Sequence, residues 1–527
     1  MSFKKIYPSV FLLSGIILLG VILILNFIYP LSLGKTNILY SDFGKFYHSQ
    51  HLFIQGKNIY TPIYFVKNKL HTSTPTSKAK PTHSKVFLLS GNLNPPFFTL
   101  ISFPLAYLSY PHALLLWTLL SMFAGTLGIL LLQQKLDGET FSVSCALLLL
   151  IALFSYFPSF VNLQFGQVSL LLLPLLVCGW RAARQKKTIS AAIFLALASS
   201  LKPFIGLFLF YFLMRKEWRG LCAFLLTLFS CALIAALFLG FDSYAAYYHV
   251  CQQIKWAASS WNVSIYGFLL RLIGGIESNV ALLPVPGLIT YLYPLLAGIF
   301  FLAIIQFLRS APEILAQRKI DLDFSVIITA MLLLSPLGWL YYFPLLSIPI
   351  LILWQWAKTG IYPIALPIML MTCIFFSNIP ISLFSSEQIH TANVLHVFFG
   401  SSLYFLVLIG LTSLLFWLRY RLAGDTHKTF SAKNSYPQQS DFCQGGVKMS
   451  NRSVFNIHED CELSGNTDKN SNAKSIHFEK IPSGLLLLIG IVVFLPSYHG
   501  IGKGTVDWLL HSTHYSQQYS LVAHHQE

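Results

Sequence analysis

The sequence predicts an all-α fold, a polytopic membrane bundle of helices. Of the 527 residues, 55% are apolar and only 10% carry a charge, a composition typical of membrane proteins. Lys, Arg, Asp and Glu are missing from four long stretches, at 86–134, 141–180, 324–356 and 388–418. Each stretch can hold a span, because a bilayer core needs about 20 apolar residues of helix. The apolar runs lack the alternation of barrel strands, so helices must satisfy the backbone in lipid.

Basic clusters between the apolar runs set the order of the helices. They lie at 4–5, 181–187, 215–219, 309–319 and 419–421. Such clusters mark cytoplasmic loops, and placing all of them inside gives a path of twelve spans. We expect these spans near residues 9–30, 112–133, 141–158, 166–181, 188–201, 203–214, 219–240, 285–308, 320–338, 341–357, 361–383 and 393–418. The first run is long and lacks a clear cleavage site, which indicates an uncleaved anchor.

The remaining segments complete the predicted organisation. Residues 1–421 form the membrane domain, whose long outer loop, 34–111, carries juxtamembrane helices and a loop helix at 95–110. Residues 67–85, rich in Lys, Thr, Ser and Pro, read as a flexible insertion in that loop. Residues 422–482 are polar and aperiodic, which predicts a disordered cytoplasmic tail, and 483–527 hold a possible extra membrane segment and a C-terminal tail.

Charge and cysteine usage narrow the function classes. The formal net charge is +16, but it lies in short topology clusters, the first loop and the tail, so it indicates membrane lipids as partners and no nucleic acid. The eight cysteines show no CxxC spacing. We find no phosphate-loop signature, no Ser-His-Asp pattern and no metal-ligand spacing, so no cofactor is expected, and a divalent metal requirement stays open.

The topology collects the unusual polar residues on the outer side. Asp42 is the only carboxylate in the first 136 residues, and it follows the first apolar run. It could cap a juxtamembrane helix, or it could act as a base that removes a proton from a sugar or lipid hydroxyl. Lys202 interrupts a charge-free stretch at a hairpin turn, where it could bind phosphate or reach the outer headgroups. Arg271 could bind phosphate or cap a helix end.

Several neutral polar and aromatic residues are candidates for substrate binding. Asn162, Gln164 and Gln167 could bind sugar hydroxyls or satisfy a loop. The substrate-binding candidates that we retain are Gln167, Asn262, Trp339 and Tyr341. Asn262 opens a glycosylation sequon, a pattern with many false positives, which we discount.

An ordered series of short motifs resembles glycosyltransferase family 87, the polyprenol-phosphate-mannose-dependent mannosyltransferases of GT-C fold. The series covers roughly residues 10–420 and comprises Asp42-Phe43 with Tyr47, 56–60, Pro95-Pro96-Phe97, 103–106, Leu116-Trp117, Gly166-Gln167-Val168, Lys202-Pro203, 262–264 with Gly267 and Arg271, and Ser335-Pro336 with Trp339. The resemblance implies a polyprenyl-phosphate sugar donor, an inverting hexosyl transfer and an acidic base in the first outer loop. Only Asp42 matches that base, and Lys202 and Arg271 become candidates for holding the leaving phosphate.

Three positions depart from the pattern that this resemblance implies. Leu340, Tyr341 and Tyr342 follow Trp339 where the family commonly has histidines. Asn94 stands in place of an aromatic residue before the proline pair, and Ser169 in place of an Asn after Gly-Gln-Val. Sugar or acceptor specificity could therefore differ, and a diverged or inactive member is possible.

The predicted function is a hexosyltransferase that moves a sugar, mannose being the first candidate, to a lipid or glycan acceptor. It would lie in the plasma (inner) membrane with its site facing the periplasm or exterior. The chief alternative is a transporter or flippase of a lipid-linked saccharide, which should show related halves and broken helices at mid-membrane. A third is an O-antigen polymerase or ligase, which would favour a large outer loop late in the chain.

Overall fold

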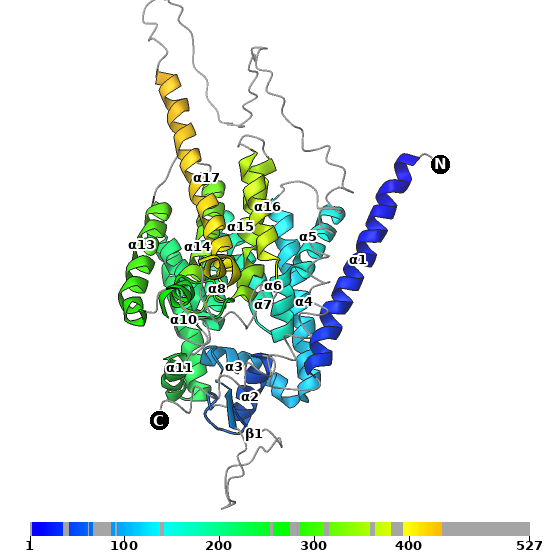
Figure 1. The fold of residues 1–527 in the computed structure, drawn as a ribbon, viewed down its shortest axis with the longest axis vertical. Coiled ribbons are helices and arrows are strands. Elements are labelled where there is room, and N and C mark those ends of the chain that lie inside the picture. Colours follow the sequence, from blue (N-terminus) through cyan, green and yellow to red (C-terminus); the bar gives the residue numbers. More distant parts are fainter. Residues whose placement is uncertain are drawn as a thin grey trace, which may run out of the picture.

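The computed structural model describes residues 3–34, 42–61, 63–66, 86–89, 92–136, 142–252, 257–274, 282, 285–309, 316–358, 364–380 and 394–434. The all-α membrane bundle is confirmed (Figure 1). Its long helices are α1 (Phe3–Gly34), α4 (Tyr110–Leu136), α5 (Val143–Ser155), α7 (Ser169–Arg184), α8 (Thr188–Leu201), α10 (Trp218–Leu239), α13 (Ile289–Arg309), α14 (Ala316–Leu334), α15 (Ser347–Lys358), α16 (Ala365–Ser377) and α17 (Leu403–Asn434).

Each of the twelve segments expected to span contains a helix, including 203–214, which holds η2 (Pro203–Leu207) and α9 (Phe208–Met214). Among the described residues, five helices are long and apolar enough to cross a membrane, or up to six if a bent pair counts as one. The twelve-span path itself stays a prediction. In α17 the helix passes the expected domain boundary at residue 421 and continues to Asn434. The rest of the predicted tail and the segment 483–527 lie outside the described residues.

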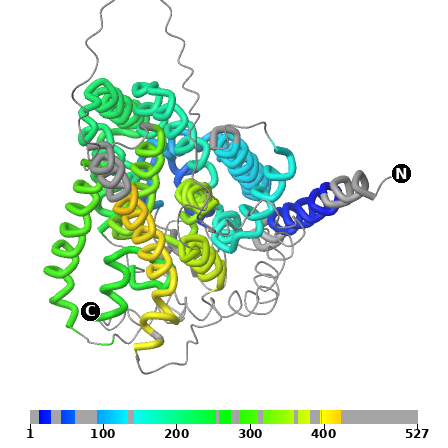
Figure 2. The backbone as a smooth tube through the Cα atoms, turned by 90° about the horizontal axis from the view of Figure 1, so that it is seen from above, coloured from blue at the N-terminus to red at the C-terminus, as the bar shows by residue number. Residues whose placement is uncertain are grey.

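The core of the bundle lies around α7 and α14. Helix α7 packs against α4, α8, α14 and η5 (Leu340–Leu346), and its inner leucines are fully buried. In contrast, α10 and α13 leave most of their apolar side chains exposed or only partly buried, as expected of helices that face lipid. The end-on view shows α1 at the edge of the bundle (Figure 2), where it packs on α4, α5 and α6 (Phe157–Phe165).

A bend of 61° separates α5 from α6, so residues expected to form an outer loop are helical instead. The break follows from Pro158, which sits in the first turn of α6 and disfavours helical backbone just before it. Backbone groups released by a break within lipid need new partners. Asn26 of α1 donates to the carbonyl of Phe154 at 2.7 Å, and Asn378 accepts from the amide of Phe157 at 2.6 Å.

One end of the bundle carries the elements of the first loop (Figure 1). They are α2 (Asp42–Ile54), strands β1 (Ile63–Val66) and β2 (Val86–Leu89), α3 (Pro96–Ser102) and η1 (Phe103–Tyr107), joined by α11 (Asp242–Gln252). The expected loop helix at 95–110 is found as α3 and η1, which pack against α2. The antiparallel strand pair, with Ile63 opposite Leu89, was not predicted. The insertion expected at 67–85 lies outside the described residues.

The opposite end gathers the basic clusters into an ion-pair network around two acids of α14. Asp323 is fully buried, lies 3.1 Å from Arg215 and lies 3.7 Å from Arg419. Asp321 accepts from the indole of Trp180 at 2.8 Å and lies 3.6 Å from Arg184. Clusters far apart in the sequence therefore meet at one end, as the predicted topology requires.

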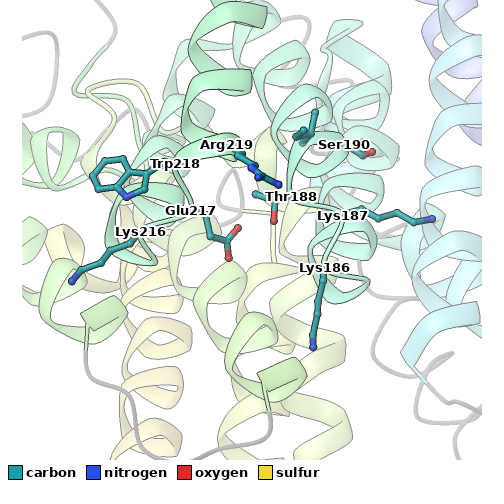
Figure 3. Close-up of a pocket in the computed structure, with 9 residues that line it drawn as sticks. Lys186, Lys187, Thr188, Ser190, Lys216, Glu217, Trp218 and Arg219 are labelled. Carbon is teal, nitrogen blue, oxygen red and sulfur yellow. The ribbon is translucent and has the colours of Figure 1, made fainter.

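A cavity of about 670 Å³ lies at this basic end, between the turns after α7 and α9 (Figure 3). It is lined by Lys186, Lys187, Thr188, Ile189, Ser190, Lys216, Glu217, Trp218 and Arg219. Its one carboxylate, Glu217, is paired with Arg215 at 2.9 Å. The cavity shares no residue with the predicted outer site.

Candidate active site

Asp42 is the first residue of α2, and the packing of the next residue, Phe43, holds the start of this helix in place. The ring of Phe43 is fully buried and packs against Trp117 of α4, with ring centroids 5.4 Å apart. The indole of Trp117 donates to the carbonyl of Gly166 at 2.8 Å. Gly166 ends α6 in the left-handed conformation, which glycine adopts without steric cost. These contacts bring the start of α2 against the end of α6.

The Asp42 carboxylate is held by donors from two directions. The amide of Gln167 donates to Oδ2 at 2.5 Å, and the ammonium of Lys45 donates to Oδ1 at 2.7 Å. Gln167 was expected to be a substrate-binding residue, but its amide nitrogen binds Asp42. Burial by itself would raise the pKa of Asp42, but the charge and hydrogen bond of Lys45, the hydrogen bond of Gln167 and the charge of Lys202 lower it below the ordinary value. Asp42 is therefore ionised at neutral pH.

Lys202 lies in the turn between α8 and η2, where Pro203 stops the helix. Its side chain is 7% exposed, and its ammonium lies 5.5 Å from the centre of the Tyr342 ring. Among the described residues, no carboxylate lies at ion-pair distance from Lys202. Burial lowers its pKa to about 8, with the nearby charge of Asp42 acting in the opposite direction. A buried cation without a close anionic partner is suited to bind an anion.

The aromatic wall of the site, formed by Tyr341, Tyr342 and Trp339, lies near Asp42. Tyr341 is anchored by its backbone carbonyl, which accepts hydrogen bonds from Ser169 and Asn162. Its ring is stacked on partly exposed Trp339, with centroids 6.0 Å apart and planes 24° apart. Tyr342 packs edge-on against Tyr341 at 4.9 Å. Trp339 and Tyr341 therefore stay candidates for contact with a sugar, whereas Asn162 serves to hold the loop.

Arg271 and Asn262 are used within the chain. Arg271 lies in the π-helix η3 (Leu270–Gly274) that follows α12 (Ile265–Leu269), and it is 2% exposed. Its guanidinium donates to the carbonyls of Ser259 and Asn262, at 2.6 and 3.0 Å, and to the hydroxyl of Ser402 at 2.9 Å. Asn262 is fully buried, and its amide binds the carbonyls of Ala257 and Pro336.

These bonds attach the 257–264 turn to the segment that carries Trp339. Asn262 and Trp339 form an isolated β-bridge, and the amide of Leu340 donates to the carbonyl of Trp261 at 2.9 Å. Arg271 thus supports the site through the backbone, and its predicted contact with a phosphate stays a prediction.

Three neighbours of Asp42 and Lys202 were missed by sequence reasoning. Lys45 lies three residues after Asp42, a spacing that places both on one face of a helix and could have revealed the pair. Tyr247 and Cys251 of α11 lie close enough to Tyr342 and Lys202, respectively, to influence the pKa values of those two residues. Nothing in the sequence marks α11 as part of the site, because tertiary packing alone brings it there.

The arrangement combines an ionised carboxylate, a buried cation and an aromatic wall at one end of a membrane bundle. Such a carboxylate can accept a proton from a hydroxyl, and such a cation can stabilise a phosphate that leaves. In the described ranges, no group of three or more His, Cys, Asp or Glu side chains is arranged to hold a metal ion.

Comparison with known families gives one match. The model of glycosyltransferase family 87 matches residues 92–336, which include Gln167, Lys202 and Arg271 but not Asp42. No curated protein and no solved structure matches the chain. The expected resemblance is confirmed by this match. Residues 92–336 therefore carry a glycosyltransferase family 87 domain, and this domain implies a membrane glycosyltransferase.

Proposed function

We propose that the protein transfers a hexose, with mannose as the first candidate, from a polyprenyl-phosphate donor to a hydroxyl of a lipid or glycan acceptor, with inversion at the anomeric carbon. The observation that carries this proposal is the convergence on Asp42 of two residues of the matched segment. Gln167 binds its carboxylate directly, and Lys202 lies close enough to lower its pKa. Asp42 itself precedes that segment, so its link to the matched domain rests on the fold and not on the sequence match.

Asp42 acts as the general base. Its side chain is 22% exposed, so an acceptor hydroxyl can reach it. An ionised carboxylate oxygen accepts more than one hydrogen bond, so the hydroxyl can bind beside Lys45 or Gln167. As the acceptor oxygen forms its bond to the anomeric carbon, its proton passes to Asp42. The bond between that carbon and the donor phosphate oxygen breaks at the same time, on the opposite face of the sugar.

Lys202 stabilises the negative charge that develops on the departing phosphate. A cation aimed at such an oxygen stabilises the transition state more than the ground state, which is the condition for catalysis. Its burial against Tyr342 removes it from water and strengthens the interaction. The packing of Tyr342 against Tyr341 connects this cation to the aromatic wall that would contact the sugar.

The donor and the site would meet at the outer face of the plasma membrane. The argument for this orientation is charge: the basic clusters and their partners Asp321 and Asp323 gather at the end opposite Asp42. Cytoplasmic loops of membrane proteins are enriched in Lys and Arg. A site at the other end faces the periplasm or exterior, where lipid-linked sugars can act as donors.

The experiment is a transfer assay with purified protein in proteoliposomes that contain polyprenyl-phosphate [¹⁴C]mannose and a lipid extract as the source of acceptor. We expect labelled product with wild-type protein and a large loss with Asp42→Asn, whereas Lys57→Met, at an exposed lysine of the same loop, retains transfer. NMR of the product should show the inverted anomer. Movement of intact donor across the bilayer without labelled product would instead support the flippase alternative.

A further inference from the structure

The pairing of Lys45 with Asp42 indicates a role beyond that of a surface charge. We propose that Lys45 is a positioning residue that keeps the Asp42 carboxylate oriented and ionised, and that expels its proton after each turnover. The inference rests on the proposed function of Asp42 as base. It concerns a residue outside the matched family segment, and it predicts how the transfer rate depends on pH.

The first argument is geometric. Lys45 and Asp42 lie three residues apart on α2, so their side chains share one face of the helix. Lys45 binds Oδ1 at 2.7 Å, while Gln167, from a different element, binds Oδ2 at 2.5 Å. With one donor on each oxygen, the plane of the carboxylate is fixed. A base held in this way presents its remaining lone pairs in one direction.

The second argument is the degree of burial. Exposed ion pairs contribute little because water screens them. In this pair the side chains of Lys45 and Asp42 are only 15% and 22% exposed, and Phe43, Phe46 and Tyr47 beside them are buried. Without a nearby cation, a carboxylate in such surroundings binds a proton more readily, and a protonated Asp42 cannot act as base.

The third argument concerns the end of the reaction. When the acceptor proton has moved to Asp42, the residue is neutral but still lies beside the Lys45 ammonium. That positive charge favours return of the carboxylate to its ionised form, so the proton is released to water. Lys202 adds to this effect only until it is engaged by phosphate. Lys45 is therefore the cation that resets the base while product phosphate occupies Lys202.

Other titratable groups surround the pair and bear on the test. Those on or next to α2 are Tyr47, His48, His51, Tyr107, Tyr110, His112, Lys202, Tyr341 and Tyr342. Burial lowers the pKa of both His48 and His51 below the ordinary value, so both are mostly neutral at pH 7. The variant His48→Gln measures the share of the nearer histidine in any acid limb.

The test is the pH profile of kcat/KM in the proteoliposome assay for wild type, Lys45→Met, Lys45→Arg and the control Lys57→Met. Loss of an adjacent cation raises a carboxylate pKa by about one unit or more. We expect the acid limb of Lys45→Met to move to higher pH by about this amount, with a lowered plateau above it because the carboxylate is no longer held in one plane. Lys45→Arg keeps the charge and should show the acid limb of wild type. The control Lys57→Met should show the same limb.

Two results would overturn the inference. An acid limb in Lys45→Met that coincides with that of wild type would show that Lys45 does not act on the base. An equal loss of rate at every pH, not rescued by Lys45→Arg, would show a purely structural role. Both differ from failure of the proposed function, which would appear as full transfer by Asp42→Asn.

Discussion

Replacing Gly166 by alanine should displace Asp42, the proposed base, from its position. Gly166 has a φ of +64°, and a Cβ added there would lie 2.5 Å from the Cβ of Phe43. Ordinary contacts begin at 3.4 Å, so α2 and the end of α6 must separate by about 1 Å. The atom it meets is Cβ on α2, which cannot rotate away. Because Phe43 follows Asp42 and Gly166 precedes Gln167, the shift acts directly on the hydrogen bond between Asp42 and Gln167.

The magnitude follows from these contacts. A left-handed alanine costs roughly 1–2 kcal/mol, and overpacking adds about 1–3 kcal/mol to the loss of stability. A misplacement of about 1 Å can lower a catalytic rate by about a hundredfold. We therefore expect Gly166→Ala to lose about that factor in kcat/KM for hexosyl transfer, while enough protein remains folded to be assayed.

Gly56 supplies a matched control for this variant. Its φ is +65°, and an added Cβ would meet nothing within 4 Å. Gly56→Ala thus carries the same backbone cost without the clash, and it should retain the wild-type transfer rate per folded molecule. The measurements are kcat/KM by radiolabel transfer and thermal unfolding in detergent. Equal rates for the two variants, after correction for the folded fraction, would refute the reasoning.

Three further predictions concern the cations and acids. Because Lys202 has a pKa of about 8, wild-type kcat/KM for the donor should fall as pH rises through 8. Lys202→Arg stays charged and should lose this alkaline limb, and an unchanged limb in this variant would exclude Lys202 as its cause. Arg271→Met should lower the free energy of unfolding by about 3 kcal/mol and change the donor KM of folded protein little, because the hydrogen bonds of Arg271 go to the chain. An intact fold with a sharply raised KM would instead favour the phosphate role. Asp323→Asn leaves Arg215 and Arg419 without their buried acid and should lower the free energy of unfolding by about 3 kcal/mol. Glu217→Gln removes a more exposed partner of Arg215 and should lower it by less than about 1 kcal/mol, so equal melting temperatures of the two variants would contradict this.

Much of the fold could be read from the sequence because hydropathy and basic clusters specify it. Charge-free runs located the helices, and Arg and Lys clusters identified one end of the bundle, where α14 now supplies the buried acids that join them. The bend at Pro158 was missed, because a short apolar helix and an apolar loop look alike in composition. The strand pair of the first loop was missed because four-residue strands give little periodic signal.

The site was predictable in part. Asp42 stood out as the only carboxylate in the first 136 residues and Lys202 as a lone charge in an uncharged stretch, and the structure brings them together. Arg271 stood out as a guanidinium suited to a phosphate, yet its bonds are to backbone carbonyls and Ser402, which no sequence pattern reveals. Gln167 was expected to bind a sugar but donates a hydrogen bond to Asp42, because the left-handed turn at Gly166 directs the chain toward α2.

The most direct test of the central claim is single-turnover transfer by Asp42→Asn with polyprenyl-phosphate [¹⁴C]mannose bound to the protein. Asparagine keeps the shape of the side chain and can still bind Gln167, but it cannot accept a proton. Loss of a general base costs about 10²–10⁴ in rate, so we expect a fall of that size in the transfer step with donor affinity within about twofold of wild type. Transfer at the wild-type rate by donor-bound Asp42→Asn would contradict the assignment of Asp42 as the base.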